Sequence, residues 1–213
     1  DILQNFLSKN KASVMSGEVK EKVRGLEETN TMRADMDFGH VAPDWNYLLN
    51  KGVLGVAEDL ENLQNQHGDN AYYSERIAVY KAMAHCFERF ALAVKELNTE
   101  KGDFIAENFY TLSHSAPKTF PQALQFILSY YRLQMDLDTV ILRSLGGLDR
   151  MLYPLYKSDL ESGRYTKEQL TEILRYFLFE ISCMEVIANL PFYICGMDEN
   201  GNEKTSTHKF ELL

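Results

Sequence analysis

Helical periodicity constrains this chain more than any other pattern, and it is clearest between Thr119 and Met135. Apolar residues recur there at the i, i+3, i+4, i+7 spacing that gathers them on one side of a helix. The residues on this stripe are Phe120, Ala123, Leu124, Ile127, Leu128, Tyr131 and Met135. Thr119 and Gln122 have the spacing of a capping box, so we expect the helix to begin at this pair.

A second capping box marks the start of another helix. Thr166 and Gln169 stand at the required spacing, and the residues that follow are apolar on several sides until about Glu185. We therefore expect this helix to be largely buried. The run from Tyr176 to Phe179, which contains three aromatic rings, is then expected in the core.

The remaining helices are less regular but have recognisable starts. The expected segments are one or two surface helices within 3–28, a loop over 29–42, and helices over Pro43–Gln66, Tyr72–Asn98 and Asp103–Leu112. Pro43 suits a first helical turn, because the N–H that proline lacks would be unpaired there. Asp44 beside it favours the positive end of the helix dipole.

Two short apolar segments are typical of strands. Thr139–Arg143 is β-branched and precedes Gly146–Gly147, and Leu190–Cys195 ends at a turn signal around Asn200–Gly201. Short apolar strands separated by helices predict a parallel sheet covered on both faces. We expect the strands near Val140 and Phe192 to be neighbours in it. The predicted fold class is α/β and rich in helix.

Length and composition restrict the class of protein. Its 213 residues correspond to one domain or one and a half, and 12 Gly with 5 Pro leave room for few long loops. A formal net charge of −9, without a basic stripe, argues against a nucleic-acid or anionic-membrane partner. Charges at Arg175, Glu180 and Glu185 interrupt the most apolar region, so we expect no membrane span. Three cysteines without a CxxC pair favour a reduced, cytoplasmic setting.

Searches for common catalytic and ligand motifs find little. The chain contains no HExxH, GxGxxG, GxxxxGK[ST] or GxSxG, and its five histidines lack metal-ligand spacing. We interpret His85, beside Cys86, as an ordinary helix histidine, since we identify no acidic residue at helical spacing to orient it. Cys183 and Cys195 lie in apolar sequence and are expected to be inert core thiols.

Two residues remain as candidates for substrate binding. His40 follows Gly39 and precedes the helix start at Pro43, so its imidazole could be held in a cavity beside a helix N-terminus. An exposed loop histidine is the alternative. Arg143 is a charge within an apolar strand, which in a doubly covered sheet requires a carboxylate or a ligand.

Four sequence blocks resemble the pyruvate formate-lyase and glycyl radical enzyme superfamily. They are Phe38–Gly55, with its Gly-His, Pro-Asp-Trp and Lys-Gly elements; Ala116–Gln125; Leu145–Gly163, which contains Leu-Gly-Gly-Leu-Asp-Arg and Leu-Tyr-Pro-Leu-Tyr; and Asn189–Asn202. The family carries Pro-Asp-Tyr in the first block, where this chain has Pro-Asp-Trp. The four blocks occur in the family's order, which makes the resemblance specific.

The resemblance implies a ten-stranded α/β barrel built from two half-barrels, of which this chain would form roughly one half with its surrounding helices. It implies a glycyl radical that passes its spin to a cysteine, and an S-adenosylmethionine-dependent activating enzyme that installs the radical. It also implies a cytoplasmic homodimer that acts on a small molecule. The family's Gly-Cys-x-Glu and Arg-Val-x-Gly-Tyr motifs do not occur in these 213 residues. We therefore expect 1–213 to be the N-terminal part of such an enzyme, without catalytic residues, metal or turnover of its own.

The resemblance leaves the substrate open among pyruvate, a diol and other compounds. Diol dehydratases carry Glu-Ser-Asn-Gly-His-Ser before the Leu-Gly block, whereas 136–143 has no His-Ser pair, which disfavours a glycerol-type site. Pyruvate formate-lyases proper have Arg where His40 stands. We favour a pyruvate formate-lyase-like member, with formate acetyltransferase or related lyase chemistry and with His40 and Arg143 as substrate contacts. The alternative is a non-catalytic helical interaction module that retains the scaffold.

Overall fold

The computed structural model describes residues 42–138, 144–183 and 192–193. Helices dominate this part of the chain, as the sequence predicts. The elements are α3 (Trp45–His67), α4 (Ala71–Lys95), α5 (Glu100–His114), α6 (Phe120–Asp138), β1 (Gly146–Gly147), α7 (Leu148–Glu161), α8 (Lys167–Ser182) and β2 (Phe192–Tyr193). The segments 3–28, Thr139–Arg143 and most of Leu190–Cys195 lie outside the described residues.

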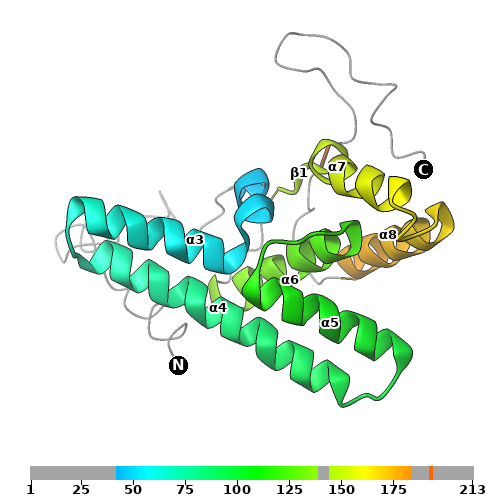
Figure 1. Cartoon of the computed structure of the whole chain (residues 1–213), viewed down its shortest axis with the longest axis horizontal. Helices are drawn as coiled ribbons and strands as arrows, with labels where there is room; N and C mark the ends of the chain where they lie inside the picture. Colours follow the sequence, from blue (N-terminus) through cyan, green and yellow to red (C-terminus); the bar gives the residue numbers. More distant parts are fainter. Residues whose placement is uncertain (1–41, 139–143, 184–191, 194–213) are drawn as a thin grey trace, which may run out of the picture.

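The helices form two groups that meet at α6. The long arms of α3 and α4 run side by side, and α5 packs on α4 (Figure 1). Helix α6 contacts α5 on one side and α7 and α8 on the other. The largest fully buried side chains come from both groups: Val53, Phe87, Leu112, Phe120, Leu124, Phe126, Ile127, Tyr131, Leu145, Leu148, Leu152 and Leu170. One apolar core therefore joins the two groups.

The strands form a small parallel pair. Gly146 lies opposite Phe192, and Gly147 lies opposite Tyr193. The expected parallel pairing of the Phe192 segment is thus confirmed, but its described partner is the Gly-Gly pair itself. Val140, the expected neighbour, lies outside the described residues.

Helix α7 is not among the helices expected from the sequence, because Pro154 lies inside it and proline removes a helical hydrogen bond. The helix buries Leu148, Leu152 and Tyr156, which stand four residues apart on one stripe. Tertiary burial of that stripe outweighs the poor local propensity.

Helix α8 begins with the predicted capping box. The Thr166 hydroxyl accepts from the Gln169 N–H at 3.2 Å, and the Gln169 side chain accepts from the Thr166 N–H at 2.9 Å. The expectation that α8 is largely buried is only partly correct. Phe177 is in the core, but Tyr176 and Phe179 are 62% and 60% exposed, because they lie off the buried stripe of Leu170, Leu174 and Phe177.

Helix α6 begins differently from the predicted capping box. Thr119 accepts from the Gln122 N–H at 3.3 Å, but the Gln122 side chain accepts from the N–H of Lys118 at 2.9 Å rather than from that of Thr119. The Phe120 N–H donates instead to the Asp159 carboxylate at 2.7 Å, 39 residues away.

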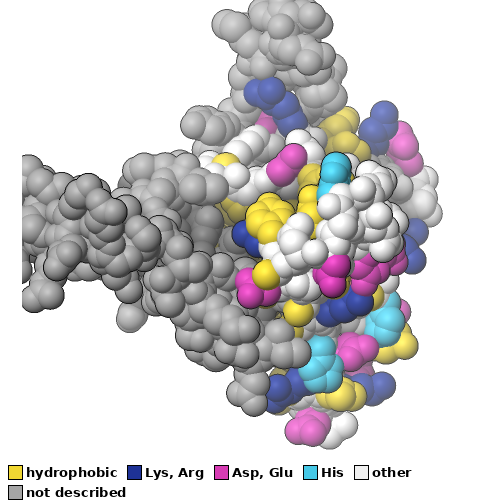
Figure 2. Space-filling view, turned by 90° about the vertical axis from the view of Figure 1, so that its left-hand side faces the viewer, with side chains coloured by type: hydrophobic (Ala, Val, Ile, Leu, Met, Phe, Trp, Pro, Cys, Tyr) yellow, Lys and Arg dark blue, Asp and Glu magenta, His cyan; other side chains and the backbone are white. Residues whose placement is uncertain are grey.

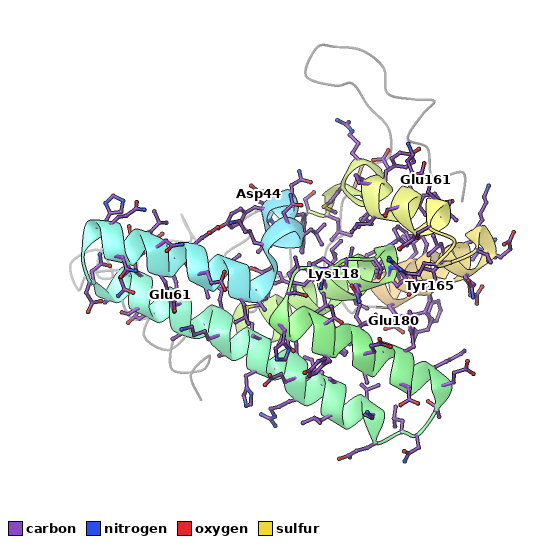
Figure 3. All side chains as sticks on the ribbon, in the orientation of Figure 1. Asp44, Glu61, Lys118, Glu161, Tyr165 and Glu180 are labelled. Carbon is purple, nitrogen blue, oxygen red and sulfur yellow. The ribbon has the colours of Figure 1, made fainter. Side chains whose placement is uncertain are left out.

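Asp159 ties this helix start to the turn between α7 and α8. The residue is fully buried, and its other oxygen accepts from Arg164 at 2.7 Å. Tyr165, on the same turn, has a side-chain hydrogen bond to Thr119, and burial followed by the Asp159 charge raises the pKa of its phenol. Figure 3 labels Lys118 and Tyr165 at this junction.

Candidate functional site

The first turn of α3 meets the segment before β1 at Trp45. Its indole N–H donates to the Ser144 carbonyl at 3.0 Å, across 99 residues of sequence. The ring stands edge-on to Tyr130 of α6, with centroids 5.7 Å apart and planes at 74°. Only 4% of Trp45 is exposed. This buried contact joins the Phe38–Gly55 block to Ser144, the residue directly before the Leu145–Gly163 block.

Local sequence explains how Trp45 is presented. Asp44 is the N-cap of α3, and its side chain accepts from the Tyr47 N–H at 3.0 Å (Figure 3). Pro43 precedes this cap rather than occupying the first turn, so the helix begins slightly later than the sequence predicts. Trp45 is therefore the first helical residue, directly after a fixed cap.

The Ser144 side of the contact leads directly into the strand pair. The Ser144 hydroxyl accepts from the Gly146 N–H at 3.0 Å. Gly146 has a φ of +62°, a conformation that glycine adopts without strain, and it pairs with Phe192 in β2. The backbone that Trp45 holds is thus the backbone that enters β1.

A corner at Gly52 turns the first part of α3 away from its long arm (Figure 1). Gly52 has a φ of +65°, and a Cβ added there would lie 2.8 Å from the Ala116 nitrogen and 2.9 Å from the Ser115 carbonyl carbon. No other residue type fits without displacing backbone. The corner therefore sets the direction of the turns that carry Trp45.

Three polar side chains, Tyr47, Lys51 and Asp59, connect the two sides of this corner. The Tyr47 hydroxyl donates to Asp59 at 2.7 Å, and Lys51 lies 2.8 Å from the same carboxylate. Burial, and then the hydrogen bond to Asp59, raise the pKa of Tyr47 to about 12. Tyr47 and Lys51 precede the corner and Asp59 follows it, so the group links the two arms of α3.

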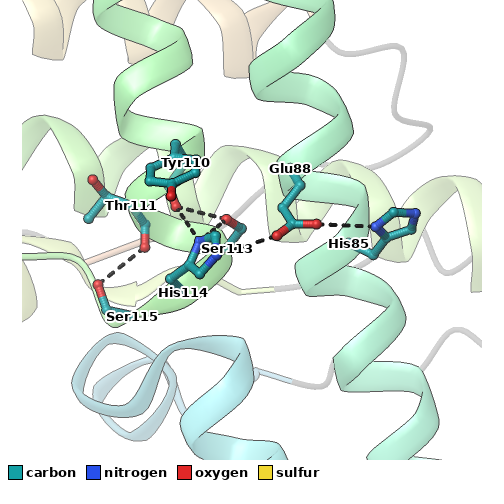
Figure 4. Close-up of polar contacts among 7 residues, drawn as sticks. All are labelled: His85, Glu88, Tyr110, Thr111, Ser113, His114 and Ser115. Atoms are coloured by element: carbon teal, nitrogen blue, oxygen red, sulfur yellow. Dashed lines mark hydrogen bonds and ion pairs between the residues drawn. The ribbon is translucent and has the colours of Figure 1, made fainter.

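A histidine and glutamate cluster lies on the surface between α4 and α5 (Figure 4). One carboxylate oxygen of Glu88 lies 3.2 Å from His85 Nδ1, and the other lies 3.4 Å from His114 Nε2. The interpretation that His85 has no acidic neighbour at helical spacing is therefore wrong, since Glu88 is three residues away. All three side chains are exposed, so these contacts contribute little to stability.

The described part of the chain holds no group of three or more His, Cys, Asp or Glu side chains arranged for a metal ion. It also contains no helix long and apolar enough to cross a membrane. Figure 2 shows acidic, basic and apolar side chains interspersed over the described part of the face at the α3–α4 end.

The structure places few of the candidates chosen from the sequence. His40, Arg143 and Cys195 lie outside the described residues. Cys183 is exposed, so the expectation of a buried thiol is wrong; it is the C-cap of α8, beyond the helix's buried residues. Sequence reasoning also missed Trp45. The available signals were its position in the Pro-Asp block and its being the only tryptophan of the chain.

Comparison with solved structures defines the class of fold. A glycerol dehydratase from Clostridium butyricum aligns with 90% of this chain and 31% of its own, at a TM-score of 0.69 and 16% identity. A glycyl radical enzyme from Archaeoglobus fulgidus aligns with 81% of this chain and 26% of its own, at a TM-score of 0.65 and 24% identity. The described helices thus have the arrangement found in glycyl radical enzymes.

Curated sequences point to the same class. The 4-hydroxyphenylacetate decarboxylase glycyl radical subunit of Clostridioides difficile is 26% identical over 186 residues, which are 75% of this chain and 21% of the relative. A probable dehydratase of Escherichia coli is 27% identical over 183 residues, 74% of this chain and 22% of its own. The chain therefore spans about a fifth of the length of these relatives.

A model of the family described as pyruvate formate lyase-like matches residues 5–213. The chain belongs to this family, within the glycyl radical enzymes, and corresponds to the N-terminal part of its members.

Proposed function

We propose that the complete protein is a glycyl radical enzyme that breaks a carbon–carbon or carbon–heteroatom bond in a small molecule. The match of the family to residues 5–213 is the observation that carries this proposal. Relatives named as a decarboxylase, a sulfite-lyase and a dehydratase support a lyase rather than another reaction class. In this proposal residues 1–213 contribute half of the α/β barrel with its covering helices.

The proposal assigns the radical chemistry to the complete protein. A glycyl radical, installed by an S-adenosylmethionine-dependent activating enzyme, would supply the hydrogen-atom abstraction. Neither the motif of the radical glycine nor that of its cysteine partner occurs in these 213 residues. This part of the enzyme alone would therefore have no turnover. The complete enzyme would be a cytoplasmic homodimer.

We assign substrate contact to His40 and Arg143. The hydrogen bond between Trp45 and Ser144 supports their placement together. Arg143 is bonded directly to Ser144. His40 stands five positions before Trp45, which bounds the distance between them at about 18 Å. A neutral imidazole can bond a substrate hydroxyl, and a cationic imidazole or guanidinium can hold a carboxylate or sulfonate.

Pyruvate cleavage with formate acetyltransferase activity is the second candidate, because the family description itself names pyruvate formate lyase. The two candidates differ in the bond that is broken and in the need for coenzyme A. A direct assay separates them.

The complete gene product, purified without oxygen, should be treated with the activating enzyme, S-adenosylmethionine and a reductant. We expect an electron paramagnetic resonance doublet from a glycyl radical. The activated protein should then be given 4-hydroxyphenylacetate, isethionate, 3-sulfopropanediol, propane-1,2-diol, glycerol, and pyruvate with coenzyme A. Turnover of any one identifies the reaction. A complete protein without the radical motifs and without the doublet would instead be the non-catalytic helical module.

A variant of the complete enzyme tests the role assigned to His40. His40→Ala should lower kcat/KM at least about tenfold, the scale of losing one polar substrate contact. His67→Ala is the matched control, since His67 is exposed at the far end of α3. Equal activity of the two variants would remove His40 from the site.

A further inference from the structure

We propose that Trp45 is a positioning residue: its indole N–H holds the backbone that enters β1 against the first turn of α3. The inference deepens the proposed function, on which it rests, because that function assigns substrate contact to the two chain segments that Trp45 and Ser144 join. Trp45 would act on substrate only through the position of these segments.

The indole is confined from two sides. Its single N–H has the Ser144 carbonyl at 3.0 Å, and its ring edge meets Tyr130 on α6. The hydroxyl of Tyr130 lies 3.4 Å from that of Tyr80 on α4. The ring is thus set against a tyrosine of α6 that itself contacts α4, which limits how far the ring can follow Ser144 if that segment moves.

The backbone beyond Ser144 transmits this position to the strand pair. Ser144 accepts from the Gly146 N–H, and Gly146 pairs with Phe192. The strand β1 consists of only two residues, and both are glycines, which have no side chain to pack. Leu145 and Leu148, which flank the strand, are buried in the core, so the hydrogen bond at Ser144 acts together with their packing to place it.

The start of α3 does not depend on this hydrogen bond for its own packing. Leu48, Leu49 and Val53 follow Trp45 into the core and are buried. Loss of the indole N–H should therefore free Ser144 while α3 stays in place. That separation distinguishes a positioning role from a general contribution to stability.

The experiment uses the complete protein and compares Trp45→Phe with Leu48→Ala. Trp45→Phe keeps an aromatic ring and removes the donor, whereas Leu48→Ala removes buried apolar volume one turn further along α3. Hydrogen–deuterium exchange is followed in peptides that cover 144–147 and in peptides of α4 and α6.

We expect Trp45→Phe to speed amide exchange over 144–147 roughly tenfold, the scale of one lost hydrogen bond, with α4 and α6 unchanged. Leu48→Ala should lower the melting temperature and speed exchange in the helices without singling out 144–147. Trp45→Tyr, which introduces the residue of the family's block and keeps a donor on the ring, should recover part of the protection. Unchanged exchange over 144–147 in Trp45→Phe, or an equal change in Leu48→Ala, would overturn the proposal.

Kinetics complete the test with the compound that the activity screen identifies. Trp45→Phe should raise KM several-fold at nearly constant kcat, and Leu48→Ala should leave KM unaltered. Faster exchange over 144–147 with no change in KM would make Trp45 a structural residue and defeat the positioning role. Absence of turnover by the parent enzyme would instead contradict the proposed function, and the exchange result would still decide whether Trp45 anchors Ser144.

Discussion

Helices α6 and α8 both begin at a threonine followed three residues later by a glutamine, yet the two helix starts are held in different ways. At α8 the pair is self-contained, and each side chain bonds the other's backbone N–H. At α6 the glutamine bonds one residue further back, and a buried carboxylate 39 residues away takes the first helical N–H.

The difference follows from burial. The start of α8 is exposed, so water can satisfy whatever the local motif leaves unpaired. Thr119, Phe120 and Gln122 are buried, so the N–H groups of α6 need partners within the protein. Asp159 is one of these partners, because it accepts from the Phe120 N–H, and its other oxygen accepts from Arg164. A capping motif in the sequence thus predicts where a helix begins better than it predicts which groups accept hydrogen bonds from its first N–H groups.

The largest effect should come from removing the remote cap. Asp159→Ala leaves the Phe120 N–H and Arg164 without their buried acceptor, which should cost about 3 kcal/mol of stability. The expected readouts are a lower melting temperature and faster hydrogen exchange in the first turn of α6, with the start of α8 less affected. Glu161→Ala is the control, because Glu161 is exposed on the same helix. Equal loss of protection at both helix starts would break the distinction drawn here.

The turn before α6 should also respond to the corner of α3. Gly52→Ala places a Cβ against the Ser115–Ala116 backbone at a positive φ, and we expect a loss of about 2 kcal/mol. Gly68→Ala is a matched control, since Gly68 also has a positive φ but a Cβ there meets nothing within 4 Å. Thermal unfolding should rank Gly52→Ala well below Gly68→Ala. The reverse order would show that the close approach at Ala116 is unimportant.

Deleting the two cap hydroxyls makes the comparison sharper. Thr119→Ala leaves a buried N–H unpaired and should cost about 2 kcal/mol, whereas Thr166→Ala at the exposed cap should cost about 1 kcal/mol. Melting temperatures of the two variants, measured together, give the comparison directly. Similar losses would mean that burial does not set the value of the cap.

The smallest effect is the contribution of Tyr165, beside the start of α6, to the response to alkaline pH. Burial and the Asp159 charge raise the pKa of Tyr165 in the folded protein. Its contribution to stability is then complete below the unfolded pKa near 10 and is lost as pH rises through the higher folded value. Tyr165→Phe should therefore lessen the fall in melting temperature above pH 10. A variant that loses stability with pH as steeply as the parent would contradict this.

Sequence patterns predicted those parts of the fold that depend on neighbours in the chain. Helices α4, α5, α6 and α8 begin within a few residues of their expected positions, because apolar spacing and caps are local signals. The corner at Gly52 was not foreseen, since a glycine within an apolar helical pattern does not reveal that another backbone lies against it. Tyr176 and Phe179 were misplaced because aromatic composition does not say which side of a helix has a partner.

The candidate site was less predictable than the fold. The Gly-His and Pro-Asp patterns indicated a site near the start of α3, and the four blocks occur in the order found in the family. The contact between Trp45 and Ser144, which stand 99 positions apart, depends on the path of the chain between them, and no local pattern encodes it. His40 and Arg143 stay predictions, and the His40→Ala variant described above tests the first of them.

The length of the connection between Trp45 and Ser144 also has a consequence during synthesis. Ribosomes add roughly 5–20 residues per second, so the carbonyl that Trp45 needs is made about 5–20 s after the indole itself. Through that interval α3, α4 and α5 can assemble while the Trp45 N–H still bonds water. Within the group formed by α3, α4 and α5, the Trp45 end of α3 is then the last part to reach its final arrangement.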